Sequence, residues 1–189
     1  MDNTNHDPQS DQPTRHTLSI QVDNRPGVLA RVITLISGRG FNIDSLSVAQ
    51  TMDPEISIIT LIITGNPKII QQIIKQLRKL VNVIKVTDLS FTDYVERQLV
   101  MVRVRAELPS NRSEIMRLCG IFRAKVVDVS LRNFALELTG GPGKIKAALG
   151  LFQAFGIDEL VSTGPTAMTK SPSPKPANGS PKGKARKEK

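Results

Sequence analysis

The turn at residues 23–27, Asp-Asn-Arg-Pro-Gly, has the residue types of a site for a small anion. It joins an alternating segment, 17–22, to a segment with helical spacing, so it should lie at the N-terminus of a helix. Free backbone N–H groups and the helix dipole favour a carboxylate there. Gly27 allows close approach to the backbone, and the Asn24 amide can donate or accept. This chemistry suits an amino acid, although capping of the helix by Asp23 or Asn24 is a commoner use of such a turn.

A second polar position follows the first expected helix. Asn42 comes directly after Gly40-Phe41 and opens another alternating segment, 42–48. We expect its side chain to reach toward a neighbouring copy of the turn at 23–27.

Both halves of the chain show the same order of elements. Alternating or β-branched segments predict strands, and apolar residues at helical spacing predict helices. Each half reads βαββαβ, the ferredoxin-like split unit, so we predict an α+β protein with two tandem modules. The expected strands are 17–22, 42–48, 56–64, 83–89, 99–107, 124–129, 134–138 and 157–162, and the expected helices are 28–36, 67–80, 111–122 and 143–155.

Two of the expected helices carry local start signals. Asn66-Pro67 is a cap followed by a proline at the first helical position. Asn111 with Glu114 three residues later resembles a capping box.

The modules are predicted to be flanked by tails. The expected units are a disordered tail at 1–15, a first module at 16–91, a short polar link around 92–98, a second module at 98–165 and a basic disordered tail at 166–189. Both tails are too poor in apolar residues to offset the entropy of ordering. The basic tail either solvates the protein or tethers it to an acidic partner or to nucleic acid.

Composition limits the possible functions and locations. Of the net charge of +9, a surplus of six lies beyond residue 165, so most of the basicity belongs to the tail. Cys119 is the only cysteine, which suits a reducing compartment. The polar N-terminus is unlike a secretory signal, and no apolar run approaches the roughly 20 residues of a membrane span. The sequence therefore predicts a cytoplasmic protein, with a processed organellar protein as the alternative.

We find no pattern typical of catalysis or metal binding. His6 and His16 are the only histidines, and no metal-ligand spacing occurs, so neither a catalytic nor a metal site is expected. Cys119 reads as a small buried hydrophobe. The Gly140–Lys144 segment lacks the spacing of a phosphate loop and is better explained as a turn before a helix. The second module is rich in arginine, which either faces an acidic partner or solvent.

Several segments of the sequence resemble those of one known family. They are DNRPGVLARV, RGFNIDSLSVA followed by Asp53-Pro54, QLRKLVNVIKV leading to Val95-Glu96-Arg97, IFRAKVVDV and the ELTG segment. Together they resemble the amino-acid-binding ACT module, and more narrowly the small regulatory subunit of acetolactate (acetohydroxyacid) synthase. The resemblance covers about residues 16–165, so the first module would be the ACT domain.

The resemblance implies a non-catalytic regulatory subunit in the biosynthesis of valine, leucine and isoleucine. Such a subunit activates a large catalytic subunit, which carries thiamine diphosphate, Mg and FAD, and holds no cofactor itself. It forms a homodimer through its ACT domains and confers feedback inhibition by a branched-chain amino acid, with valine the expected effector. Carried over by motif position, the effector-binding residues are Asn24, Gly27, Val28, Leu29, Asn42 and Ile43.

Two other functions fit the same fold. A nucleic-acid-binding module would stack bases on aromatic residues of its strands, but here those positions hold Ile, Val and Leu, with Phe41 and Phe134 isolated. A free-standing ACT sensor for another amino-acid enzyme is the second alternative. The family-specific segments in the second half of the chain argue against it.

Overall fold

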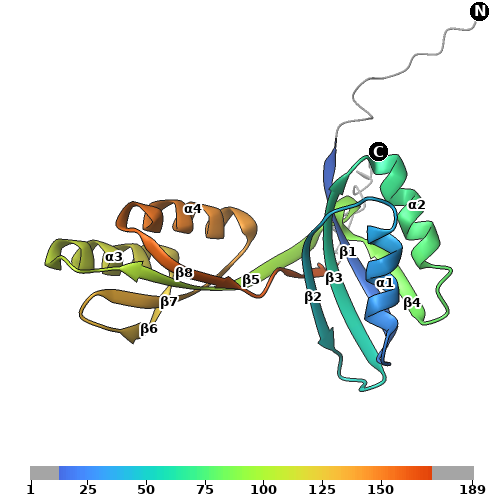
Figure 1. Ribbon diagram of the computed structural model, residues 1–189, viewed down its shortest axis with the longest axis horizontal. Helices are drawn as coiled ribbons and strands as arrows, with labels where there is room; N and C mark the ends of the chain where they lie inside the picture. Colours follow the sequence, from blue (N-terminus) through green and yellow to red (C-terminus); the bar gives the residue numbers. More distant parts are fainter. Residues whose placement is uncertain (1–12, 172–189) are drawn as a thin grey trace, which may run out of the picture.

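The computed structural model describes residues 13–171 and contains two modules, each a four-stranded antiparallel sheet with two helices on one face (Figure 1). The predicted α+β fold with two βαββαβ modules is confirmed. The first module consists of β1 (Thr14–Asp23), α1 (Val28–Ser37), β2 (Ile43–Gln50), β3 (Ile56–Gly65), α2 (Pro67–Leu77) and β4 (Val83–Asp88).

The first sheet has the strand order β2-β3-β1-β4, so β1 and β3 are central and β2 is an edge strand. The alternation of the sequence is the cause of the layering, because successive side chains of a strand point to opposite faces. Leu18, Ile20 and Val22 of β1 face the helices and are almost completely buried. Fourteen buried residues from β1, β3, β4 and both helices form this core.

Local signals place the ends of the first two helices. Gly27 precedes α1 with φ of 82°, a left-handed conformation that favours glycine, and Gly38 ends the helix. Asn66 caps α2 by accepting a hydrogen bond from the Lys68 N–H, and Pro67 occupies the first turn, as predicted.

The second module repeats this topology. Its sheet has the order β6-β7-β5-β8, with the first strand of the unit again in the centre, and its core contains Phe134, Phe152 and aliphatic residues of β5 and β7. Its elements are β5 (Tyr94–Arg105), α3 (Pro109–Phe122), β6 (Lys125–Val129), β7 (Asn133–Gly140), α4 (Pro142–Phe152) and β8 (Ile157–Ser162).

The structure corrects three predicted boundaries. Residues 94–98 of the expected link belong to β5, which continues into the second sheet as one strand (Figure 1). The expected basic tail begins with a further strand, β9 (Thr166–Thr169), which pairs with the first four residues of β5. Strand β1 already begins at Thr14, inside the expected N-terminal tail. The rest of both tails lies outside the described residues.

The predicted capping box of the third helix is wrong. Leu108 is the N-cap of α3 and Pro109 opens its first turn, which places Asn111 inside the helix. A proline at the first helical position needs no N–H acceptor, so it supplies the start signal instead.

None of the helices within residues 13–171 is long and apolar enough to cross a membrane.

Candidate functional site

The turn at 23–27 is fixed to the β2–β3 loop by hydrogen bonds. The Asn24 N–H donates to the Glu55 carbonyl at 2.7 Å, and its side-chain Nδ2 donates to the Pro54 carbonyl at 2.9 Å. Gln50, the last residue of β2, donates to the same Pro54 oxygen at 2.9 Å. The turn therefore lies beside the C-terminal end of β2. Asn24 keeps its Oδ1 as a free acceptor within the described residues.

Neither Asp23 nor Asn24 caps α1, so the commoner interpretation of the turn does not hold. Asp23 is occupied elsewhere, because its Oδ2 accepts from Nδ2 of Asn82 at 2.9 Å. Gly27 is the N-cap residue, without a side-chain cap hydrogen bond, and the first turn of α1 carries no acidic residue. In the part of the chain that the structure describes, the N–H groups of Leu29 and Ala30 have no acceptor. The helix start thus presents N–H donors to an external anion.

Gly27, the residue before α1, has open space on the side where a side chain would stand. A Cβ added at this position would meet no atom within 4 Å. The close approach expected from the sequence is therefore sterically possible.

The apolar candidates differ in how much they expose. Leu29 is 39% exposed and Ile43 is half-buried, so both can contribute to a slot for an aliphatic side chain. Val28 is only 5% exposed, and its side chain packs into the core. It also lines a cavity of about 180 Å³ between α1 and the α2–β4 loop. The expected role of Val28 in an effector slot is thus restricted to its backbone and to this small cavity.

Asn42 and Ile43 lie at the opposite end of the sheet from the turn. Asp23 pairs with Ile56 at one end of β3, whereas Ile43 pairs with Ile63 near the other end. Seven residues of strand separate these levels, which is roughly 23 Å at the usual rise per residue. One chain cannot bring the six candidate residues together. A shared site needs a second copy of the chain.

Three residues that position the turn were not among the candidate site residues. Gln50, Pro54 and Asn82 hold it through the hydrogen bonds given above, and Asn82 also accepts from Nη1 of Arg31 at 3.1 Å. They approach the turn only because of strand register and loop packing.

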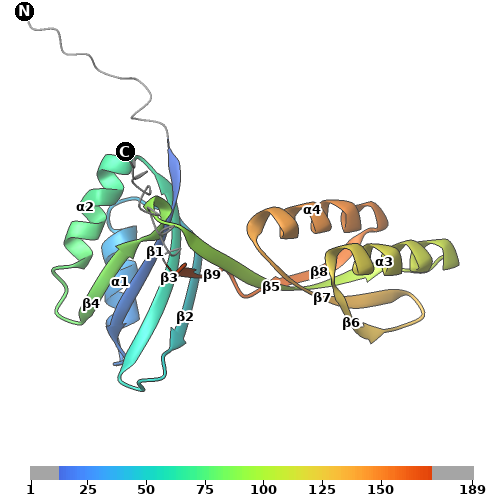
Figure 2. The same cartoon turned by 180° about the vertical axis from the view of Figure 1, so that it is seen from behind.

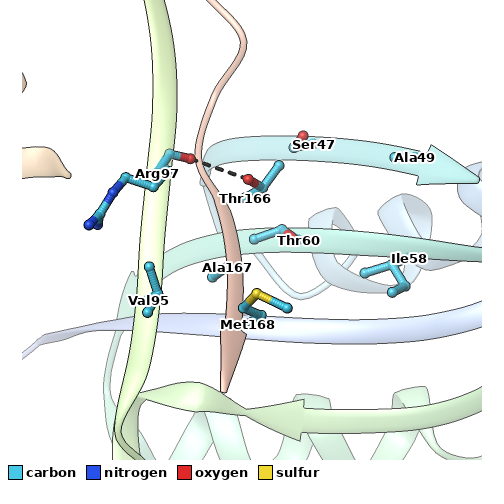
Figure 3. A pocket seen from close by; sticks show the side chains of 9 residues that line it. All are labelled: Ser47, Ala49, Ile58, Thr60, Val95, Arg97, Thr166, Ala167 and Met168. Carbon is cyan, nitrogen blue, oxygen red and sulfur yellow. Dashed lines mark hydrogen bonds between the residues drawn. The ribbon is translucent and has the colours of Figure 1, made fainter. Parts of the chain in front are cut away.

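A larger cavity, of about 320 Å³, lies away from the turn. Figure 3 shows it between the helix-free face of the first sheet and the paired β5 and β9. None of the six candidate effector-binding residues lines it, and β9, which forms one of its walls, was expected to be part of a tail. Its lining residues are Ser47, Ala49, Ile58, Thr60, Val95, Arg97, Thr166, Ala167 and Met168.

His16 forms a hydrogen-bonded chain that the sequence did not predict. Its Nδ1 lies 2.8 Å from Asp88 Oδ2, and its Nε2 lies 2.8 Å from Thr14 Oγ1. The order of groups resembles a hydroxyl–imidazole–carboxylate triad. However, His16 is only 2% exposed and Phe91 lies edge-on at 5.7 Å, so a substrate cannot reach the imidazole. These hydrogen bonds connect β1 to the end of β4, so the role of His16 is structural.

Other candidate groups are also used structurally. Lys144 of the glycine-rich segment donates to the Thr139 carbonyl at 2.8 Å, which favours the turn interpretation over an anion site. Arg112 stacks on Phe134 at 4.3 Å and donates to backbone carbonyls. Arg103, Arg105 and Arg117 pair with acidic residues of the same module. These arginines thus have partners within the chain. Among residues 13–171 no His, Cys, Asp and Glu side chains cluster as a metal site would require.

The aromatic side chains do not form a base-stacking platform. Phe134 is 5% exposed in the core of the second module, and Phe41 packs against the core of the first. The helix-free face of the first sheet instead carries small side chains such as Ser47, Ala49 and Thr60. The stacking mode of RNA-recognition sheets has no counterpart on this face.

The Cys119 thiol is predicted to be unreactive in the folded protein. Cys119 is 4% exposed, and burial raises its pKa, so little thiolate is present at neutral pH. Labelling with a thiol-specific disulfide reagent at pH 7 should be slow in buffer and complete within minutes in denaturant. Rapid labelling of the native protein would contradict this prediction.

Comparison with known proteins identifies both modules. Residues 18–85 match the family profile of the "AHAS small subunit-like ACT domain", and residues 97–171 match "Small subunit of acetolactate synthase". The chain is 45% identical over 156 residues to the Archaeoglobus fulgidus protein named "Probable acetolactate synthase small subunit", covering 82% of this chain and 97% of that protein. It is 43% identical over 157 residues to the Aquifex aeolicus acetolactate synthase small subunit, covering 83% of this chain and 82% of that protein.

A solved structure supports the same comparison. The crystal structure of the acetolactate synthase small subunit from Thermotoga maritima matches 84% of this chain and 98% of that chain. Its TM-score is 0.75 at 36% sequence identity.

Proposed function

Because this chain belongs to the family of acetolactate synthase small subunits, we propose that it activates the large catalytic subunit and makes it sensitive to a branched-chain amino acid. The chain is the regulatory, non-catalytic subunit of that enzyme, as the sequence predicted. Its place is in branched-chain amino acid biosynthesis. The effector is proposed to be valine, bound where two ACT modules meet.

One observation carries the proposal for the site. The candidate residues fall into two groups at opposite ends of β2, the turn with Asn24 and Gly27 at one end and Asn42 with Ile43 at the other. Within the described chain β2 pairs with β3 alone, so its outer edge has no strand partner. If two copies pair their β2 edges antiparallel about a twofold axis, Asn42 of the second copy comes to the turn of the first. Two equivalent sites result.

The chemistry of each group suits one part of an amino acid. The N–H groups of Leu29 and Ala30, at the start of α1, would bind the effector carboxylate. Asn24 Oδ1 would accept from the ammonium, and the Asn42 amide would complete the polar contacts from the second copy. Leu29 and Ile43 would contact the branched side chain. Valine and leucine differ there by one methylene, which is worth only about 1–3 kcal/mol.

The same family assignment indicates which subunit holds the cofactors and which holds the effector. We propose that thiamine diphosphate, Mg and FAD are held by the large subunit and that this chain holds no cofactor. Regulation is then a coupling free energy between the effector site and the distant active site, of about 1–3 kcal/mol. The complex is proposed to act in the cytoplasm.

The test is reconstitution with the large subunit from the same organism. Adding this chain should raise acetolactate formation, and valine should then inhibit the complex but not the large subunit alone. Leucine and isoleucine, assayed in parallel, identify the effector. An unchanged activity on adding this chain would refute the proposed function, and inhibition of the large subunit alone would place the effector site on that subunit.

A further inference from the structure

The linker between β8 and β9 touches β2, the strand whose two ends lie next to the two groups of candidate effector-binding residues. Gly164 in this linker has φ of 74°, and a Cβ added there would lie 2.7 Å from Ser45 Oγ and 3.4 Å from the Leu46 carbonyl oxygen. The backbone of Gly164 therefore packs directly on β2. Such an approach requires a residue without a side chain.

The linker is also fixed to β5. The Thr163 N–H donates to the Leu99 carbonyl at 3.1 Å, and Thr163 Oγ1 accepts from the Leu99 N–H at 3.2 Å. Pro165 is buried, and the next residues form β9, which pairs with Tyr94–Arg97 of β5. Gly164 is thus the contact point of a segment held firmly to the strand that joins the modules.

Strand β5 carries this connection into the second module without a break. Its first four residues pair with β9 and the following eight pair with β7, and five of those also pair with β8 (Figure 2). A paired strand is a stiff element, so a shift at its first residues is passed to the second sheet.

A second contact ties the start of β5 to the first module. The Arg15 guanidinium forms a bidentate pair with Glu96, with Nη1 to Oε2 at 3.1 Å, and Glu96 is only 7% exposed. Burial disfavours the charged guanidinium, but the hydrogen bond and charge of Glu96 outweigh it and raise the pKa of Arg15. This pair attaches β5 to β1, whereas Gly164 attaches the linker to β2.

Two cavities lie next to the paired β5 and β9, which leaves room for movement. The cavity of about 320 Å³ lies between them and the first sheet (Figure 3). Another of about 400 Å³, lined by Arg15, Ser45, Glu96 and Gly164 among others, separates the modules. Met168 of β9 is 70% exposed, so the strand is not packed into a core. A small shift of β2 can therefore move the β5–β9 pair without breaking either hydrophobic core.

We propose that Gly164 is a positioning residue that relays the state of the effector site from β2 through the linker and β5 to the second module. This inference rests on the proposed function, because it takes β2 to be the strand that the effector restrains. When the effector fixes β2, the contact at Gly164 fixes the angle between the modules, and the large subunit responds to that angle.

The test replaces Gly164 by alanine in the reconstituted complex. Gly164→Ala pushes the linker away from Ser45, so the ratio of uninhibited to inhibited activity at saturating valine should fall at least about fivefold, the lower end of typical allosteric coupling. Activation without effector should persist, as should calorimetric binding of valine by the isolated small subunit. Gly150→Ala controls for replacing a glycine of the second module without a steric clash, because Gly150 lies in α4 with no atom within 4 Å of an added Cβ.

A second substitution separates a relay from local strain. Because the added Cβ meets Ser45 Oγ, combining Gly164→Ala with Ser45→Ala should restore part of the inhibition. If inhibition is not restored, the effect comes from strain at the positive φ and the relay through β2 is refuted. Wild-type inhibition in Gly164→Ala, or loss of valine binding by it, would also refute the relay.

A third variant covers a failure of Gly164→Ala to fold. Ser45→Leu, with Gly164 retained, presses on the linker from the side of β2 and should give the same loss of inhibition. Wild-type inhibition in that variant would overturn the relay. If the unmodified complex is insensitive to all three branched-chain amino acids, the proposed function itself fails. That result is distinct from failure of the relay, in which the unmodified complex is inhibited.

Discussion

Gly27→Asp should abolish feedback inhibition and leave activation of the large subunit intact. The new carboxylate would be added at the N-cap position of α1, next to the residues with free N–H groups, where its negative charge repels the effector carboxylate. The change strains the backbone, because Gly27 has φ of 82°, but Asp is among the residues that adopt a positive φ most easily and an added Cβ meets no atom within 4 Å, so the module should still fold. The valine concentration for half-inhibition should rise at least about 100-fold, equivalent to about 3 kcal/mol.

The matched control is Gly143→Asp. Gly143 lies in the first turn of α4, and a Cβ there also meets no atom within 4 Å, so the variant adds the same charge at a helix start of the other module. Its inhibition curve should overlay that of the wild type. If Gly27→Asp is inhibited by valine in the wild-type range, the effector site lies elsewhere and the assignment of the turn is wrong.

The fold was predictable because the signals for its elements are local. Leu18 and Ile20 alternate with polar residues along β1, and Asn66-Pro67 marks the start of α2 within two residues. The two modules also repeat one order of elements, so each supports the interpretation of the other. The failed capping box at Asn111 shows the limit of such signals, since Leu108-Pro109 competes with it nearby.

The β5–β9 pair could not be predicted, since its cause is not local. Thr166–Thr169 has only one large apolar residue and leads into a segment rich in Lys, Pro and Ser, so its composition resembles a tail. Its partner, Tyr94–Arg97, is about 70 residues earlier in the chain. Only the path of the chain through both modules brings the two segments together. The residue pattern within each segment gives no indication of this pairing.

The place of the turn was predictable, but its hydrogen bonds were not. The turn lies at the start of α1 as expected, and yet its residues leave the helix uncapped and attach to Pro54 and Asn82 instead. The separation of Asn42 from the turn follows from the register of β2 on β3. Register depends on pairing between distant residues and therefore has no signature in a single segment.

The stability of the second module depends strongly on a single large aromatic residue, which the core of the first module does not. Phe152 is fully buried at the end of α4, where it packs in a core of thirteen buried residues with Val104, Ile115 and Leu136. The first core instead spreads its volume over many isoleucines and leucines. Removing Phe152 should therefore damage one module and spare the other.

Phe152→Ala is expected to destabilise the second module by about 3–5 kcal/mol, the usual cost of deleting a buried phenylalanine. Domains of this size have a total stability of only about 5–15 kcal/mol, so the second module should open frequently under native conditions. Hydrogen exchange followed by mass spectrometry is the suitable measurement, because it reports each module separately where one unfolding curve would mix them. Peptides from β5 and β7 should lose protection, while those from β1 and β3 keep it.

Leu151→Ala is the control, since Leu151 is the adjacent residue of α4 and is 49% exposed. It removes a side chain from the same helix and should leave exchange in β5 and β7 close to that of the wild type. Equal loss of protection in both modules of Phe152→Ala would contradict separate cores. The modules would then unfold as one unit, with the β5–β9 pair as part of a common structure. Loss confined to the second module would instead show that the modules are joined by few contacts, which is the arrangement that a relay through Gly164 requires.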